Sequence, residues 1–300
     1  MGKKGWWRAL AAVALAGCSS EEPAPVDVTE RIDEAQLLSG ATAKGSISHL
    51  LAHSRVIMTA GVEGALAADQ TAGANGDAVA KQYLASKTTC PGLTVTHGPG
   101  SDTVKIVLPA NGCKLAGVSV SGLVTVTVKI EAAVAVAQFV LQSVKVDATQ
   151  IDGTATESTS DGKTFTSEIK KMVVDKTTYT FSGTFAKDTD GAGSTSNGAG
   201  TALAAGESAA AAFLIQGLHH KLEGCYADAG QLVWTQQTAL TAPAALKGKL
   251  VSAVTTLQFD ADSPRDGSVD ATVQLGAGKA SAKKEVILPK YGTCPDGTAP

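Results

Sequence analysis

The sequence predicts an α+β protein, in which N-terminal helices pack on a large antiparallel β-meander that forms a sandwich or an open barrel. Two observations predict this class. Apolar residues recur at helical spacing over residues 46–68, and beyond Cys90 they alternate with polar residues as in half-buried strands. Short turns such as Asp161-Gly162 separate the alternating segments, which favours antiparallel hairpins over βαβ units.

The 300 residues divide into six segments by composition and periodicity. These are a lipoprotein signal peptide (1–17), a tether (18–28), a helical segment (29–88), a first β block (89–186), a Gly/Ala/Ser-rich loop (187–210) and a second β block (211–300). The pattern leaves open whether the β blocks form one domain or two.

The first eighteen residues have the layout of an export signal. Lys3, Lys4 and Arg8 precede a short apolar run that ends in LAGC at 15–18. The run is too short to span a bilayer as a helix. Its end resembles the lipobox of bacterial lipoproteins. The resemblance implies that Cys18 becomes the first mature residue and carries a lipid, and that Ser19, which is not Asp, directs the protein to the outer membrane. The sequence leaves the face of that membrane open.

The helical segment is expected to contain two or three helices. Thr29 is a plausible cap for a first, short one. The clearest helix covers 46–68, with an apolar stripe that includes Leu51 and Met58. A weaker helix is expected over 77–87, with its inward residues at Val79, Tyr83 and Leu84.

The β blocks begin where the apolar period changes to two. Residues 118–130 place Val on one face, and Gly122 marks a bend or bulge. Residues 134–146 continue the Val face, with Phe139 and Leu141 on the opposite face. Residues 187–210 are interpreted as a long loop or linker. Further strands are expected over 213–222, 249–259, 268–275 and 280–288.

Four cysteines remain once Cys18 is assigned to the lipid, and an even number in an oxidising compartment predicts two disulfides. Three pairings are possible. Cys90–Cys113 with Cys225–Cys294 is favoured because each pair brackets its own strand-rich block. None of the four lies in a Cys-x-x-Cys motif, so disulfides are favoured over a zinc site.

Two motifs in the body support a second resemblance. Cys90-Pro91 and Cys113-Lys114 precede a Val/Thr-rich strand, and LPKYGTCP occupies 288–295. In these features the chain resembles β-rich, two-cystine lipoproteins of Gram-negative bacteria. The resemblance implies location and architecture but no activity.

Charge and composition exclude nucleic acid as a partner. The formal charge is −3 and becomes −6 when Lys3, Lys4 and Arg8 leave with the signal peptide, so the mature chain repels phosphate backbones. Aromatic residues make up only 4%, and Trp234 is the single tryptophan after residue 17, so rows of base-stacking rings are missing. The same negative charge gives the chain no attraction to anionic lipid, so membrane attachment must rest on the lipid at Cys18.

Histidines provide two candidate metal sites, and both are weak. His49 and His53 share one helix face, but Leu50 stands where a zinc-protease helix needs Glu. His219 and His220 are neighbours, which on a strand point to opposite faces, so one is expected half-buried and the other exposed. We therefore expect no metal and no cofactor.

Two other motifs match catalytic or calcium-binding patterns only by letter. The DTDG run at 188–191 fails the EF-hand pattern at its fifth and twelfth positions. Ser160 and Lys163 satisfy Ser-x-x-Lys but lie in an expected hairpin turn. We therefore expect no enzyme.

The function expected is a lipid-anchored cell-envelope protein with a non-catalytic binding or structural role. Its partners are the membrane, through Cys18, and an envelope protein or an apolar ligand. The alternative is a carrier that holds an apolar ligand between sheet and helix, and a hydrolase ranks last. Two structural observations would distinguish these alternatives. A cavity lined only by Val and Ala would favour the carrier, and a cleft with converging Asp, Glu or His would favour the enzyme.

Overall fold

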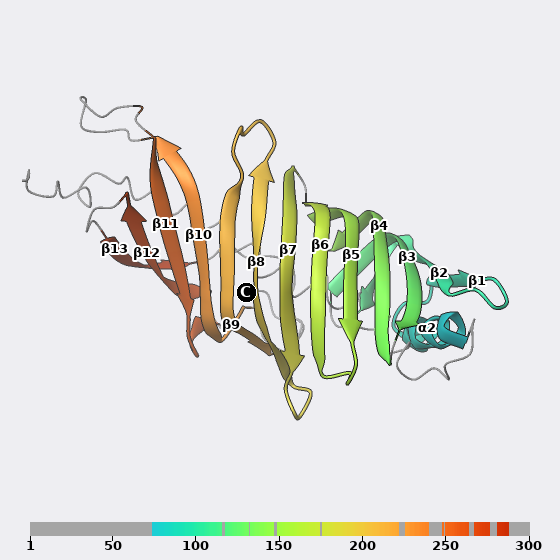
Figure 1. Cartoon of the computed structure of the whole chain (residues 1–300). Coiled ribbons are helices and arrows are strands. Elements are labelled where there is room, and N and C mark those ends of the chain that lie inside the picture. The colour runs from blue at the N-terminus through green and yellow to red at the C-terminus, as the bar shows by residue number, and fades with distance from the viewer. Residues whose placement is uncertain are drawn as a thin grey trace, which may run out of the picture.

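The computed structural model shows an all-β architecture rather than the α+β class expected (Figure 1). It describes residues 74–115, 118–131, 133–146, 149–174, 176–221, 226–239, 248, 250–263, 267–276 and 281–287. Within these ranges there are one α-helix, one 3₁₀ turn and a single sheet of thirteen strands. The α+β prediction is therefore wrong. The helices expected from Thr29 and over 46–68 lie outside the described residues.

The predicted antiparallel meander is confirmed, because every strand pairs antiparallel with its neighbours in sequence and the spatial order is β1 to β13. The strands are β1 (Thr94–His97), β2 (Thr103–Leu115), β3 (Val118–Glu131), β4 (Val134–Val146), β5 (Thr149–Thr159), β6 (Thr164–Val174), β7 (Thr177–Lys187), β8 (Gly193–Ala204), β9 (Ala211–Lys221), β10 (Ala229–Ala239), β11 (Leu250–Phe259), β12 (Ser268–Leu275) and β13 (Ser281–Ile287).

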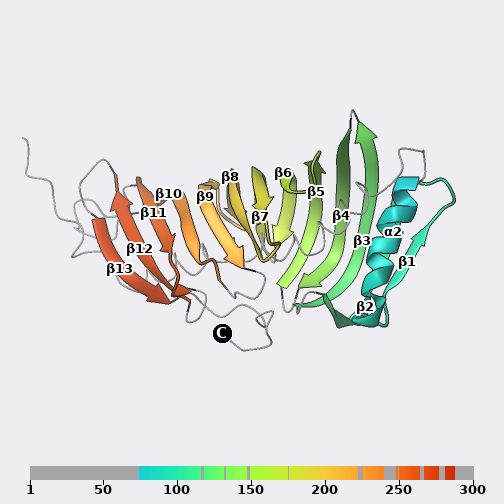
Figure 2. The same ribbon diagram turned by 90° about the horizontal axis from the view of Figure 1, so that it is seen from below.

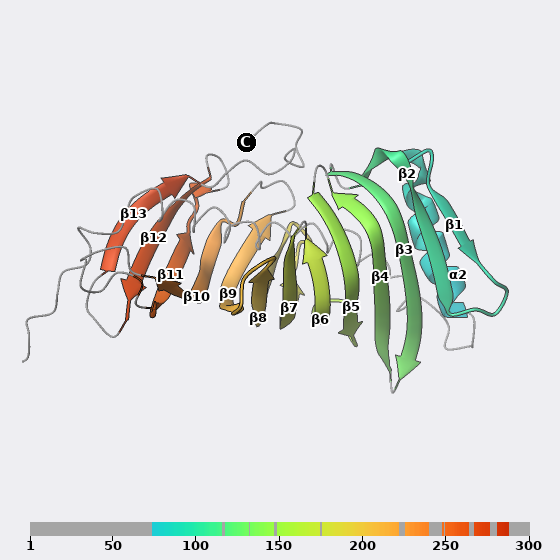
Figure 3. The ribbon, with the colours of Figure 1, turned by 90° about the horizontal axis from the view of Figure 1, so that it is seen from above.

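The sheet is a single curved layer (Figures 2 and 3). Its two faces differ in burial. Alternate residues of each strand are buried, as in the iBiBeBeBeeBeB pattern of β4, and the buried side chains form one cluster from α2 to β12. We call the face that carries them the inner face. The outer face presents Thr, Ser and Lys side chains to solvent, as expected for an antiparallel sheet with one solvated face.

Helix α2 (Ala74–Ala85) packs against β1, β2 and β3 at one end of the sheet. Val79 and Tyr83 are buried, as the sequence predicts, but Leu84 is 43% exposed. Burial, together with the charge of the buried Glu157 on β5, raises the pKa of Tyr83, which keeps its phenol protonated. No helix among these described residues is long and apolar enough to cross a membrane.

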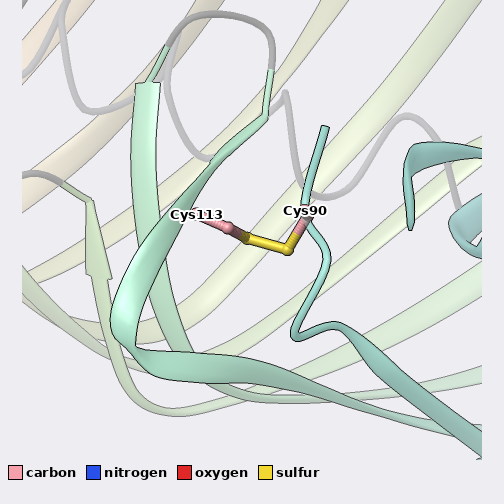
Figure 4. Close-up of a disulfide and its surroundings, with 2 residues drawn as sticks. All are labelled: Cys90 and Cys113. Atoms are coloured by element: carbon pink, nitrogen blue, oxygen red, sulfur yellow. A yellow bond between two sulfur atoms is a disulfide. The ribbon is translucent and has the colours of Figure 1, made fainter. Parts of the chain in front are cut away.

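A disulfide joins Cys90 to Cys113, one of the two predicted pairs (Figure 4). Cys90 lies just before β1, and Cys113 lies in β2. Their Cα atoms are 4.9 Å apart, which suits a disulfide. The bond therefore ties the segment that follows α2 to the second strand. The second predicted pair, Cys225–Cys294, lies outside the described residues.

The bulge predicted at Gly122 is confirmed, but the face predicted for β4 is wrong over most of its length. Gly122 has a φ of 114°, and the β3–β4 register shifts beside it. In β4 the buried side includes Phe139 and Leu141, whereas Val140 is 38% exposed. The face changes at Ser143, which has a positive φ of 49°, so Val144 is buried again.

The loop predicted over 187–210 is also wrong, because β8 occupies Gly193–Ala204 and pairs with β7 and β9. The physical reason is the space needed by neighbouring rings. A Cβ on Gly200 would lie 2.0 Å from the carbonyl oxygen of Thr180 and 2.5 Å from Cζ of Phe213. Glycine by itself indicates a loop. Here its lack of a side chain leaves room for the ring of Phe213 above the backbone of β8. Strand β8 also joins the two expected β blocks into one sheet.

Candidate functional site: a pocket at one end of the inner face

An aromatic row crosses the inner face of the second half of the sheet. The rings of Phe181 on β7 and Phe213 on β9 are stacked at a centroid distance of 6.3 Å. Phe213 in turn stacks with Trp234 on β10 at 6.0 Å. The three side chains are largely buried. The rings on β7 and β9 reach over the glycines of β8 that lie between them.

A pocket of about 580 Å³ lies where this row ends. Its size falls in the range of small-molecule sites. Small side chains of β8, β9 and their connection leave the space, and Tyr179 and Trp234 stand beside it. The described residues that line it are Thr177, Tyr179, Ala202, Ala204, Glu207, Ser208, Ala209, Ala211, Trp234, Gln236, Gln237 and Leu250.

The polar side chains of the pocket come from β7, from the β8–β9 connection and from β10. Glu207 and Ser208 belong to the connection and are exposed. Gln236 accepts a hydrogen bond from the indole Nε1–H of Trp234 at 2.8 Å, which holds the ring and the carboxamide together. Among the described residues that line the pocket there is no Lys, Arg or His, and the one charge they carry is the carboxylate of Glu207. The lining can therefore accept hydrogen bonds, donate them from neutral groups and pack against apolar surface, and it disfavours anions.

A second polar cluster joins two hairpin connections to the end of β9. His219 contacts Asp188 through Nε2, at 2.8 Å from Oδ2, and contacts Asp228 through Nδ1. Lys221 Nζ lies 3.1 Å from Oδ2 of Asp228. Asp188 begins the β7–β8 turn, and Asp228 precedes β10. One imidazole thus connects two loops that are forty residues apart in the chain.

The surroundings of this cluster stabilise its charged forms. Burial alone would lower the pKa of His219, but the hydrogen bonds and charges of Asp188 and Asp228 outweigh it and raise that pKa. Burial would raise the pKa of Asp228, but the hydrogen bonds and charges of His219 and Lys221 lower it. Because both ring nitrogens face carboxylates, the protonated imidazole, which can donate a hydrogen bond from each nitrogen, is favoured over the neutral ring.

This arrangement suits a structural role in holding the two loops together. We call the group of His219, Asp188, Asp228 and Lys221 the clamp. The two carboxylates lie at opposite nitrogens of the ring and do not converge on one point. Across the described ranges, no group of three His, Cys, Asp or Glu side chains is placed to hold a metal ion. The expectation that only one of His219 and His220 is half-buried is wrong, since both are.

The remaining sequence candidates fall into two groups. Cys18, Cys225 and Cys294, and the His49/His53 pair, lie outside the described residues. The turn predicted around Asp161 is confirmed between β5 and β6. There the backbone N–H groups of Thr164 and Lys163 each donate to the Asp161 carboxylate at 2.8 Å, which lowers its pKa.

Sequence reasoning missed both the pocket and the clamp. The partners of His219 come from different hairpins, 31 and 9 residues away. The available signal was weak. Asp188 and Asp228 each lie in a turn-rich segment between strands, but only Asp228 directly follows the strand that contains His219, and β8 separates Asp188 from it. The pocket gave no local signal, because it is formed by the absence of large side chains on β8.

No protein-family model, curated protein or solved structure matches the chain.

Proposed function

We propose that the protein is a lipid-anchored protein of the bacterial cell envelope, held at the outer membrane through Cys18, with a non-catalytic binding role. The lipobox at 15–18 and Ser19 support the anchor and its location. The pocket of about 580 Å³ between Tyr179, Trp234 and the β8–β9 connection carries the binding role, because it combines concave shape, aromatic surface and neutral hydrogen-bonding groups.

The composition of the pocket bears on the alternative function, a carrier of an apolar ligand. Four alanines and Leu250 give the lining apolar surface. Its hydroxyl, carboxamide and carboxylate groups, however, would lose their hydrogen bonds to water if a wholly apolar ligand filled it. The pocket therefore favours a ligand with polar groups over a purely apolar one.

The anchor is tested by fractionation of cells that express the full chain or its Cys18→Ala variant. The unaltered protein should be found in the outer-membrane fraction and carry acyl chains detectable by mass spectrometry. Cys18→Ala should remain unprocessed or leave the membrane. Identical partitioning and processing of the two proteins would contradict the proposal.

The absence of catalysis is tested separately with the purified full chain in detergent. We expect no turnover of ester, peptide or glycoside substrates, with or without added zinc or calcium. Activity that disappears when a single His, Asp or Glu is replaced would establish an enzyme and reject the non-catalytic role.

A further inference from the structure

The polar groups of the pocket match a neutral ligand that carries several hydroxyl groups. One carboxamide (Gln236) and two hydroxyls (Thr177 and Ser208) line it. Each of these groups can both donate and accept hydrogen bonds, as a sugar hydroxyl can. The carboxylate of Glu207 adds an acceptor for which hydroxyl groups are suitable donors.

The aromatic side chains supply the second requirement of such a ligand. A pyranose ring has an apolar face of C–H groups, which packs favourably on an aromatic ring. Tyr179 and Trp234 line the pocket, and Trp234 is fixed by its hydrogen bond to Gln236 and by stacking on Phe213. A preformed ring loses little conformational freedom when a ligand binds, which favours affinity.

The charge of the pocket favours a neutral ligand over anions and organic cations. None of the described lining residues is basic, so these residues offer an anion only the repulsion of Glu207. An organic cation would be attracted by Glu207 and by the ring faces. Glu207 is exposed, however, so solvent screens its charge, and the other polar groups of the lining are neutral.

We propose that this pocket, formed by the ends of β7–β10, the β8–β9 connection and Leu250, binds a saccharide. The proposal rests on the binding role described above and names the ligand class for the same site. Glu207, Gln236 and Ser208 hydrogen-bond to the sugar hydroxyls, and Tyr179 and Trp234 pack against the ring. Leu250, which is 64% exposed, lies against the apolar edge of the sugar.

The chain contains a suitable reporter. Its tryptophans are Trp6, Trp7 and Trp234, so a full chain with Trp6→Phe and Trp7→Phe emits from Trp234 alone. We would purify this chain in detergent and titrate it with the methyl glycosides of glucose, galactose, mannose and N-acetylglucosamine. Choline and decanoate would be titrated in parallel. A saturable fluorescence change with at least one glycoside is expected, and none with choline or decanoate.

Two pocket variants and two matched controls locate the binding. Gln236→Ala should weaken glycoside binding by about tenfold, the effect of one lost hydrogen bond. Ala209→Leu places a larger side chain at the exposed rim and should abolish binding. Gln231→Ala, on the same strand outside the pocket, and Ala199→Leu, on the exposed outer face of β8, should bind as the parent does. Thermal melts of all four check that each folds.

The possible outcomes separate the two proposals. Saturation by choline or decanoate in place of glycosides would overturn the saccharide assignment and leave a binding role intact. Glycoside binding that survives both pocket variants would overturn the assignment to this pocket. No saturation by any of the probes would also overturn the saccharide proposal. The anchoring test at Cys18 would still decide the envelope location by itself.

Discussion

The Nε2 atom of His219 lies 2.8 Å from the Oδ2 atom of Asp188, which fastens the end of β9 to the turn between β7 and β8. Asp228 contacts the Nδ1 atom of the same ring, and Lys221 neutralises part of the negative charge of Asp228. The clamp therefore couples the stability of three neighbouring strands to the protonation of one imidazole.

Stability should depend on pH through this clamp. The folded state raises the pKa of His219 above its ordinary 6.5, so the contribution of the imidazolium is complete below about 6.5 and is lost as pH rises through the folded-state value. The folded state lowers the pKa of Asp228 below its ordinary 3.8, so that contribution is present above 3.8 and is lost as pH falls through the folded-state value. The clamp is strongest between these limits.

The measurement is the melting temperature of the unaltered chain and of His219→Gln from pH 4 to 9. The variant should lose about 1 kcal/mol near pH 6, after allowance for solvent screening of a half-buried group, and the difference should shrink above neutral pH. His97→Gln is the control, because His97 pairs with Asp77 in a more exposed position. Parallel pH profiles for the unaltered chain and His219→Gln would contradict the role of the clamp.

Gly193→Ala should disturb the same clamp, because the added methyl group would collide with two of its side chains. A Cβ at this position would lie 2.5 Å from Oδ2 of Asp188 and 2.8 Å from Nε2 of His219. We expect a loss of roughly 1–3 kcal/mol in the free energy of unfolding, measured by urea titration. Gly98→Ala is the control, because its Cβ would meet only the Cβ of Ser101 at 3.7 Å. Equal stabilities of the two variants would show that the site accommodates a methyl group.

Gly200→Ala should destabilise the centre of the sheet. The added methyl would meet the Thr180 carbonyl oxygen and the Phe213 ring, and the backbone partner cannot move without breaking the pairing of β7 with β8. A loss of roughly 2–3 kcal/mol is expected in the same titration. Ala199→Val, on the adjacent exposed position of β8, should change stability far less. A variant of Gly200 as stable as that of Ala199 would refute the packing argument.

Removal of the disulfide should be costly at the α2 end of the sheet. The bond closes a loop with a sequence separation of 23, so the Cys90→Ala/Cys113→Ala double variant should lose about 3 kcal/mol. Non-reducing peptide mapping of the unaltered chain should show the Cys90–Cys113 and Cys225–Cys294 linkages. A Cys113–Cys225 peptide, or free thiols at these positions, would reject the pairing.

Local sequence patterns predicted the meander, the Gly122 bulge and the turn at Asp161 because each depends on residues near one another in the chain. The face of β4 was not predictable from its valines. Valine occurs on both sides of this strand, and the positive φ of Ser143 reverses the alternation midway. The choice between faces is made by packing of Phe139 in the core, a tertiary effect.

Strand β8 and the candidate site were missed for a related reason. Glycine, alanine and serine in 193–204 indicate a loop when considered alone, yet the same residues form a strand because the rings of Phe181 and Phe213 occupy the space above them. The pocket depends on the same small residues, and the clamp on loops brought together by the sheet. These features could be predicted only if it were known which strands are neighbours in the sheet.

The unbroken strand order gives the molecule a modular architecture. Each strand pairs only with the strands before and after it in the chain, so a hairpin adds its own length to the sheet without altering distant pairings. Insertion or deletion of two strands preserves the antiparallel direction of everything that follows. Such a protein can change its span during evolution in steps of one hairpin. Relatives with longer or shorter sheets would then differ in the number of hairpins between the two edges.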